Sequence, residues 1–172
     1  PKAVEILHYV EKNCSKNYYH HGSTTGIAFL EHSEQSELLH ILKRNNWTTV
    51  SFAIHGTDIT HNKIVNHKRG LESIIEASHI FKSNGFEVWL SFMITKELKK
   101  DLPKLGILLD KIPYDGILPV IPDFYPTSRL VKYQEIRCNQ NEYGEIVDFL
   151  KKRNIDIQHL ETCIRFYNEE TV

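Results

Sequence analysis

The side chains best suited to chemistry in this chain follow a segment, residues 48–54, that is rich in β-branched and aromatic residues. Such a composition predicts a buried strand. The polar loop behind it contains His55, Asp58 and His61, whose imidazole and carboxylate groups could ligate a metal ion. Their spacing matches no recognised metal-ligand pattern. A metal site and a pocket for an organic cofactor therefore both remain open, with Gly26 and Gly56 allowing a cofactor close to the backbone.

Side chains alternate along this predicted strand, so its two faces differ in character. Ser51, Ala53 and His55 share a small and polar face, whereas the intervening residues form a bulky apolar face. This pattern is typical of a barrel strand with helices packed outside and a ligand inside.

Strands and helices are predicted to alternate along the chain. The predicted strands are 18–23, 48–54, 86–95 and 116–121, and the predicted helices are 2–13, 71–83, 97–112, 142–153 and one that begins after Ser33 and ends at Asn45. Strict alternation predicts an α/β fold with a parallel sheet of right-handed βα units. The continuous apolar run 86–95 predicts a strand buried on both faces. Residues 122–138 are interpreted as a long functional loop or a covering segment, and one or two short strands are expected within 155–167.

Polar residues follow several of these predicted strands and should meet at the carboxyl edge of the sheet, where such folds place their active sites. They are His20, His21, Ser23, Thr24 and Thr25; Ser51, His55, Asp58 and His61; Ser91 and Thr95; and Asp123 and Tyr125.

The composition of the chain limits the classes of function that it could have. The chain has 172 residues, enough for one domain, with 21 Lys and Arg against 22 Asp and Glu. Near-neutral charge favours neither nucleic acid nor an anionic membrane as a partner. The apolar runs are too short to span a bilayer. Three unevenly spaced cysteines give no disulfide framework and indicate a reducing, cytoplasmic location.

Five segments resemble motifs of the radical S-adenosylmethionine (SAM) superfamily, in the order of that family and on the predicted elements. The likeness runs from about Pro1 to Pro122 and is best over 51–105. The segments are Thr24-Thr25-Gly26, Ala53-Ile54-His55-Gly56, His61-Asn62-Lys63-Ile64-Val65 with Lys68-Arg69-Gly70-Leu71, Phe81-Lys82-Ser83-Asn84-Gly85-Phe86-Glu87-Val88, and Ser91-Phe92-Met93-Ile94-Thr95-Lys96.

This resemblance implies a partial (β/α) barrel over residues 1–153, lacking its first strands, and a C-terminal extension over 154–172. It implies an oxidoreductase-type enzyme that binds SAM beside a 4Fe-4S cluster. A 5′-deoxyadenosyl radical would then abstract hydrogen from a small-molecule or peptide substrate, with electrons from a separate donor. The implied cofactor-binding residues are Thr25, Gly26, Ser51, His55, Gly56, Ser91 and Ile121, and the catalytic residues are unknown.

The chain also departs from the family pattern. The Cys-x-x-x-Cys-x-x-Cys loop that holds the cluster is absent, as is the Gly-Gly-Glu motif, and both belong before the position at which this sequence begins. We therefore expect a fragment that by itself binds no cluster and cleaves no SAM. Thr25, Ala53 and Val65 replace residues common in the family. Two alternatives remain: a metal-dependent hydrolase that uses His55, Asp58 and His61, and a cluster-less binding domain without catalysis.

Overall fold

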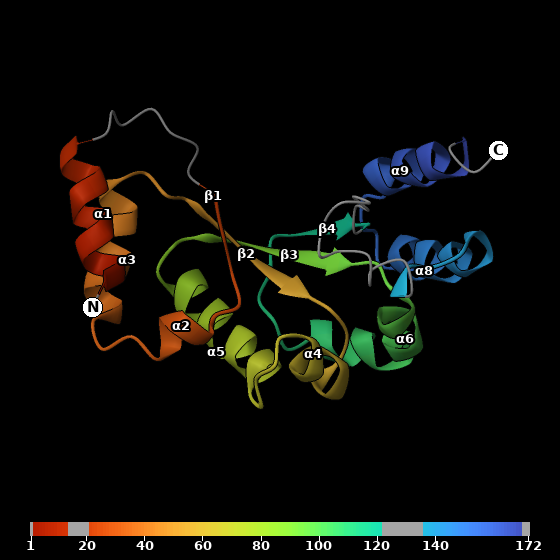
Figure 1. Cartoon of the computed structure of the whole chain (residues 1–172), viewed down its shortest axis with the longest axis horizontal. Coiled ribbons are helices and arrows are strands. Elements are labelled where there is room, and N and C mark those ends of the chain that lie inside the picture. The colour runs from red at the N-terminus through yellow and green to blue at the C-terminus, as the bar shows by residue number, and fades with distance from the viewer. Residues whose placement is uncertain (1, 14–20, 122–135, 170–172) are drawn as a thin grey trace.

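The structure is a computed structural model that describes residues 2–13, 21–121 and 136–169 (Figure 1). The strands are β1 (His21–Thr24), β2 (Thr49–Ile54), β3 (Glu87–Met93) and β4 (Gly116–Val120). The helices are α1 (Lys2–Asn13), α2 (Ile27–Leu30), α3 (Gln35–Arg44), α4 (Asp58–Ile64), α5 (Gly70–Ser83), α6 (Lys96–Leu109), α8 (Gln140–Lys152) and α9 (Gln158–Glu169).

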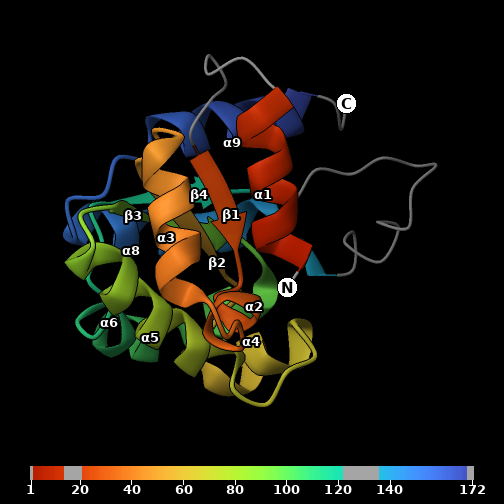
Figure 2. The same ribbon diagram turned by 90° about the vertical axis from the view of Figure 1, so that its left-hand side faces the viewer.

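Within the described residues the strands form one parallel sheet in the order β1-β2-β3-β4. This is also their order along the chain, so each connection moves one strand in the same direction. Because βα crossovers are right-handed, every connecting helix then lies on the same face of the sheet. Figures 1 and 2 show α5, α4 and α6 gathered on one side of the strands, and α1 packs against α3 while α8 packs against α6. The predicted α/β fold with a parallel sheet is confirmed.

The helix-covered face of the sheet is the main core. Val50, Phe52 and Ile54 of β2 alternate with residues of the other face, and all three are at most 5% exposed. The matching residues of β3, Val88, Leu90 and Phe92, are fully buried. Ile74, Ala77 and Phe81 of α5 belong to the same cluster. Burying each large apolar side chain contributes roughly 1.5–3 kcal/mol, so this face accounts for much of the stability.

The opposite face is only half covered, and we call it the open face. In register across it lie Ser51, Trp89 and Gly116, and next to them Ala53, Ser91 and Leu118. Trp89 and Ser91 are half-buried, and Leu118 is 42% exposed. The expectation that β3 is buried on both faces is therefore wrong: Trp89, Ser91 and Met93 are only half-buried, and the helices α4, α5 and α6 lie on the other side of the strands (Figure 1).

Local capping signals explain several helix boundaries. Thr95 accepts a hydrogen bond from the Leu98 amide at 3.2 Å and begins α6, and Asn139 and Glu142 form a capping box at the start of α8. Gly85, with φ of 81°, follows the end of α5 in a left-handed conformation that glycine adopts readily. The helix expected after Ser33 is α3, which begins at Gln35; its N-cap residue is Glu34, whose side chain makes no capping hydrogen bond.

Two predicted segments differ in the structure. Residues 58–64 were expected to be loop but form α4, and the strands expected within 155–167 are replaced by α9. Ile157, Leu160 and Ile164 recur at helical intervals, and Leu160 is 1% exposed. Packing of this periodic face against α8 and β4 overrides the β-propensity of the isoleucines. The boundary expected after residue 153 stays a prediction.

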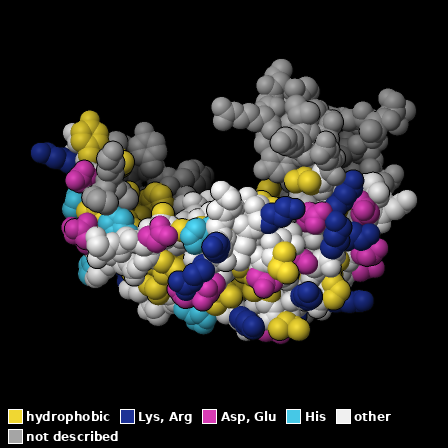
Figure 3. All heavy atoms as spheres, turned by 60° about the horizontal axis from the view of Figure 1, so that its bottom comes forward, with side chains coloured by type: hydrophobic (Ala, Val, Ile, Leu, Met, Phe, Trp, Pro, Cys, Tyr) yellow, Lys and Arg dark blue, Asp and Glu magenta, His cyan; other side chains and the backbone are white. Residues whose placement is uncertain are grey.

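Positive and negative side chains intermix on the outer face of the helices (Figure 3). Arg69, for example, contacts Glu72 at 2.6 Å and Glu76 at 2.9 Å. Among the described residues no helix combines the length and the apolar character needed to cross a bilayer.

The two faces of the sheet should respond differently to the same substitution. Leu90→Ala removes a fully buried side chain and should lower the free energy of unfolding by about 2–5 kcal/mol. Leu118→Ala, the matched control on the open face of the neighbouring strand, should cost about 1 kcal/mol or less. Urea unfolding of both variants measures the difference. Equal losses would contradict the one-sided cover of the sheet.

Candidate functional site

The candidate site lies on the open face and at the carboxyl edge where the parallel strands end. Its central feature is the turn that joins β2 to α4, residues 55–57, which we call the β2–α4 turn. Side chains from two helices contact this turn, and the small residues of β2 and β3 lie beside it in the sheet.

His61 of α4 contacts the turn from inside the protein. Its side chain is fully buried, and its Nδ1 accepts a hydrogen bond from the backbone N–H of His55 at 3.3 Å. The two imidazole rings lie 5.5 Å apart between centroids. His61 therefore supports the backbone of the turn and is not open to a substrate.

Burial keeps both histidines neutral near pH 7. Desolvation, followed by the neighbouring charge of His55, lowers the pKa of His61 to about 4, and desolvation also lowers the pKa of His55. Because Nδ1 of His61 accepts a hydrogen bond, the proton of its neutral ring is on Nε2. That Nε2 atom is buried and has no hydrogen-bond partner among the described residues.

Asp101 of α6 holds the other end of the turn. Its Oδ2 accepts a hydrogen bond from the backbone N–H of Thr57 at 2.7 Å. Desolvation raises the pKa of Asp101, but hydrogen bonds from Thr57 and Thr60 and the charge of Lys104 outweigh that effect, so the pKa lies below its ordinary value. A negative charge bonded to a backbone amide makes this contact a strong one.

Gly56 and Gly26, two residues implied as cofactor contacts, are both required by packing. A Cβ at Gly56, where φ is 148°, would lie 2.7 Å from Oδ2 of Asp101. A Cβ at Gly26, where φ is 76°, would lie 2.9 Å from the carbonyl oxygen of Ser73 in α5. Each glycine lets a strand-to-helix turn approach a neighbouring helix. Packing alone therefore explains why glycine is present at both positions, without a contact to a ligand.

The other implied contacts fall in different environments. Ser51 is 2% exposed and Ser91 is half-buried, both on the open face. Thr25 is exposed beside Gly26. Ile121 follows β4, is 6% exposed and belongs to the main apolar core. His20, Asp123 and Tyr125 lie outside the described residues.

Two residues of this region were not among the residues predicted from the sequence. Trp89 belongs to the open face, and a Cβ at Gly116 would lie 2.7 Å from its indole ring, which places the ring against β4. The alternation of Trp89, Ser91 and Met93 along β3 is the signal that could have found it. Asp101 has no local signal, because the residue that it binds is 44 positions away.

The structure does not assemble His55, Asp58 and His61 into a metal site. Within the described ranges, no group of three or more His, Cys, Asp or Glu side chains is arranged to hold a metal ion. Asp58 is exposed at the first residue of α4, whereas His61 is fully buried. Cys138 is also buried, which raises the pKa of its thiol to about 11.

Comparison with known proteins leaves the site to be interpreted from its own geometry. The chain matches no model of a known protein family, and no curated protein matches it significantly.

The buried imidazole of His61 should make stability depend on pH. The unfolded chain protonates this ring near pH 6.5 and the folded chain only near pH 4, so the unfolded state binds more protons between these values. Stability is therefore lost as pH falls through this window, by about 3 kcal/mol for a shift of this size. Urea unfolding should show a smaller acid-induced loss in His61→Gln than in the wild type. His40→Gln, at an exposed position, should keep the wild-type dependence; an unchanged dependence in His61→Gln would contradict the assignment.

Removal of the Asp101 carboxylate should loosen the β2–α4 turn. Asp101→Ala leaves the Thr57 amide without its acceptor and should cost about 1.5–3 kcal/mol, with less lost in Asp101→Asn, which keeps an acceptor oxygen. Hydrogen exchange of the Thr57 amide should accelerate in the alanine variant. Glu97→Ala on the same helix removes only an exposed contact with Lys100 and serves as the control. Slow exchange retained in Asp101→Ala would argue against this contact.

Proposed function

We propose that this chain is part of a radical SAM enzyme and that it binds S-adenosylmethionine on its open face, as part of a partial (β/α) barrel in a cytoplasmic protein. The observation that carries the proposal is the one-sided cover of the sheet. Strands in sequential order with their helices on one face form the wall of such a barrel, whose inner face is available to a ligand.

The residues of the open face suit the chemical parts of SAM. The cofactor has a flat adenine ring, ribose hydroxyls and a charged amino acid end. Ser91 offers a half-buried hydroxyl group and Ser51 a hydroxyl group that is only 2% exposed, and Trp89 and Leu118 offer apolar surface beside them. Adenine packs well against apolar and aromatic side chains, and ribose hydroxyls need hydrogen-bonding partners.

The chain's own residues would bind and orient the cofactor. SAM, when bound beside its cluster, supplies the 5′-deoxyadenosyl radical that abstracts hydrogen. The hydroxyls of Ser51 and Ser91 would hold polar groups of the cofactor, and the neutral ring of His55 could donate or accept one hydrogen bond at the carboxyl edge. His61 and Asp101 would fix the β2–α4 turn, so that little order has to be gained on binding.

The described residues do not fit the 4Fe-4S cluster. Three thiolates would be needed close together, and no such group occurs in the described ranges. Cys138 is buried with its thiol protonated, and Cys163 is half-buried elsewhere. The cluster ligands would therefore come from outside these residues. The substrate, a small molecule or a peptide, and the electron donor belong to the same proposal.

Cofactor binding tests the proposal. Equilibrium dialysis with SAM, on the natural gene product that contains these residues, should detect binding that Ser51→Ala and Ser91→Ala each weaken about 5- to 10-fold, the value of one hydrogen bond. Ser36→Ala, at an exposed position of α3, should have no effect. After anaerobic reconstitution and reduction, 5′-deoxyadenosine should form. Absence of SAM binding would overturn the proposal. Binding without cleavage would indicate a non-catalytic relative, and zinc that is lost in His55→Ala would indicate a hydrolase.

A further inference from the structure

The edge strand β1 leaves space in the apolar layer beneath it. Along the sheet, Val50 of β2 lies beside Gly22, and Phe52 lies beside Thr24. The residues that β1 turns toward the helices are therefore glycine and threonine, where β2 has valine and phenylalanine. The Trp47 ring packs against Gly22, where a Cβ would clash with it, and the space left by these small residues lies between Trp47 and the other side chains below β1.

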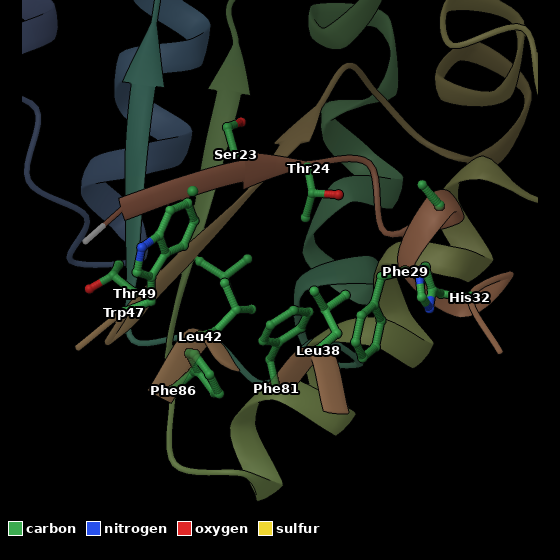
Figure 4. A pocket seen from close by; sticks show the side chains of 13 residues that line it. Ser23, Thr24, Phe29, His32, Leu38, Leu42, Trp47, Thr49, Phe81 and Phe86 are labelled. Atoms are coloured by element: carbon green, nitrogen blue, oxygen red, sulfur yellow. The ribbon is translucent and has the colours of Figure 1, made fainter. Parts of the chain in front are cut away.

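A cavity of about 240 Å³ occupies this position, between β1 and helices α2, α3 and α5. Its walls are mainly apolar and aromatic: Phe29, Leu38, Leu42, Trp47, Phe81 and Phe86. Figure 4 shows these side chains converging below β1, while Ser23 points away toward the other face of the sheet. The cavity is thus separated by the sheet from Ser51 and Ser91.

The volume sets the size of the ligand. Protein interiors contain few voids larger than a water molecule, and an apolar cavity of about 150 Å³ is large enough to bind benzene. This cavity exceeds that by more than half, enough for two fused aromatic rings. The rings of Phe29 and Phe81, 4.6 Å apart between centroids, provide aromatic faces and edges for such a ligand.

The wall also contains polar residues: Ser23, Thr24 and Thr49 carry hydroxyl groups, and His32 carries an imidazole. The Nδ1 atom of His32 accepts a hydrogen bond from the backbone N–H of Glu34 at 3.1 Å, so its neutral ring carries the proton on Nε2. The Nε2 atom is buried and has no hydrogen-bond partner among the described residues. A buried donor without an acceptor is destabilising, and a ligand oxygen that accepts its hydrogen bond would relieve that cost.

We propose that this cavity binds a small, flat, aromatic molecule of two fused rings that carries one hydrogen-bond acceptor, with the acceptor facing Nε2 of His32. The apolar walls take the ring system, and the single unpaired donor selects the ligand that has an oxygen at one edge. The site is on the helix-covered face of the sheet and is independent of the proposed cofactor site.

Two probes of nearly equal shape test the proposal: 2-acetylnaphthalene, which has a carbonyl acceptor, and 2-ethylnaphthalene, which lacks it. The chain has two tryptophans, so a Trp89→Phe background leaves Trp47, in the cavity wall, as the only indole. Both probes should quench its fluorescence, and the ketone should bind at least about 5-fold more tightly, the value of one hydrogen bond.

Variants assign the binding to the cavity and to His32. His32→Phe should abolish the preference for the ketone, and His40→Phe, a matched substitution at an exposed position of α3, should retain it. Ala28→Phe should block both probes, because Ala28 is exposed where it lines the cavity and a larger side chain there need not disturb the core. Leu38→Phe is a second blocking variant, and circular dichroism checks the fold of each.

Three results would overturn the proposal. The first is no quenching of Trp47 up to the solubility limit of the probes. The second is quenching that persists in well-folded Ala28→Phe and Leu38→Phe. The third is a preference for the ketone that survives in His32→Phe.

Discussion

The handedness of the βα crossover is the constraint from which most of this structure follows. Each of the strands β1 to β4 pairs with the next one along the chain, and a right-handed connection can then place its helix on one face only. The side chains on that face, such as Phe52 and Leu90, become the core. The alternate side chains, such as Ser51 and Ser91, point to the other face, away from the connecting helices α4, α5 and α6 (Figure 1). The open face is thus a consequence of topology.

The β2–α4 turn shows how this fold positions a site. The backbone amides of His55 and Thr57 are both bound by side chains, one from α4 and one from α6. His61 and Asp101 can influence ligand binding without contacting the ligand. Each holds in place a part of the β2–α4 turn whose backbone a bound ligand would contact. The arrangement depends on charge state: a neutral imidazole accepts one amide proton and an ionised carboxylate accepts the other. Gly56 leaves the room in which these contacts fit.

Small residues leave space on both faces of the sheet, and the two spaces differ in chemical character. On the open face, serine and alanine leave surface that a polar cofactor could occupy. On the helix-covered face, Gly22 and Thr24 of β1 leave an aromatic-walled cavity with one unpaired donor, His32. One sheet therefore separates two chemically different environments, one small and polar and the other apolar. The proposals for the two faces rest on separate observations and do not depend on each other.

Local patterns in the sequence determined the α/β class, the approximate positions of the four described strands and the end of α5 near Ser83, because periodicity and backbone conformation are properties of neighbouring residues. The alternation of β2 likewise predicted which of its residues face the core. Tertiary structure alone decided the rest. Packing made helices of residues 58–64 and of α9, buried His61 beneath the turn, and left one face of β3 half-covered. The contact of Asp101 with Thr57 joins residues 44 positions apart, and no local pattern encodes a pairing that only the folded chain brings together.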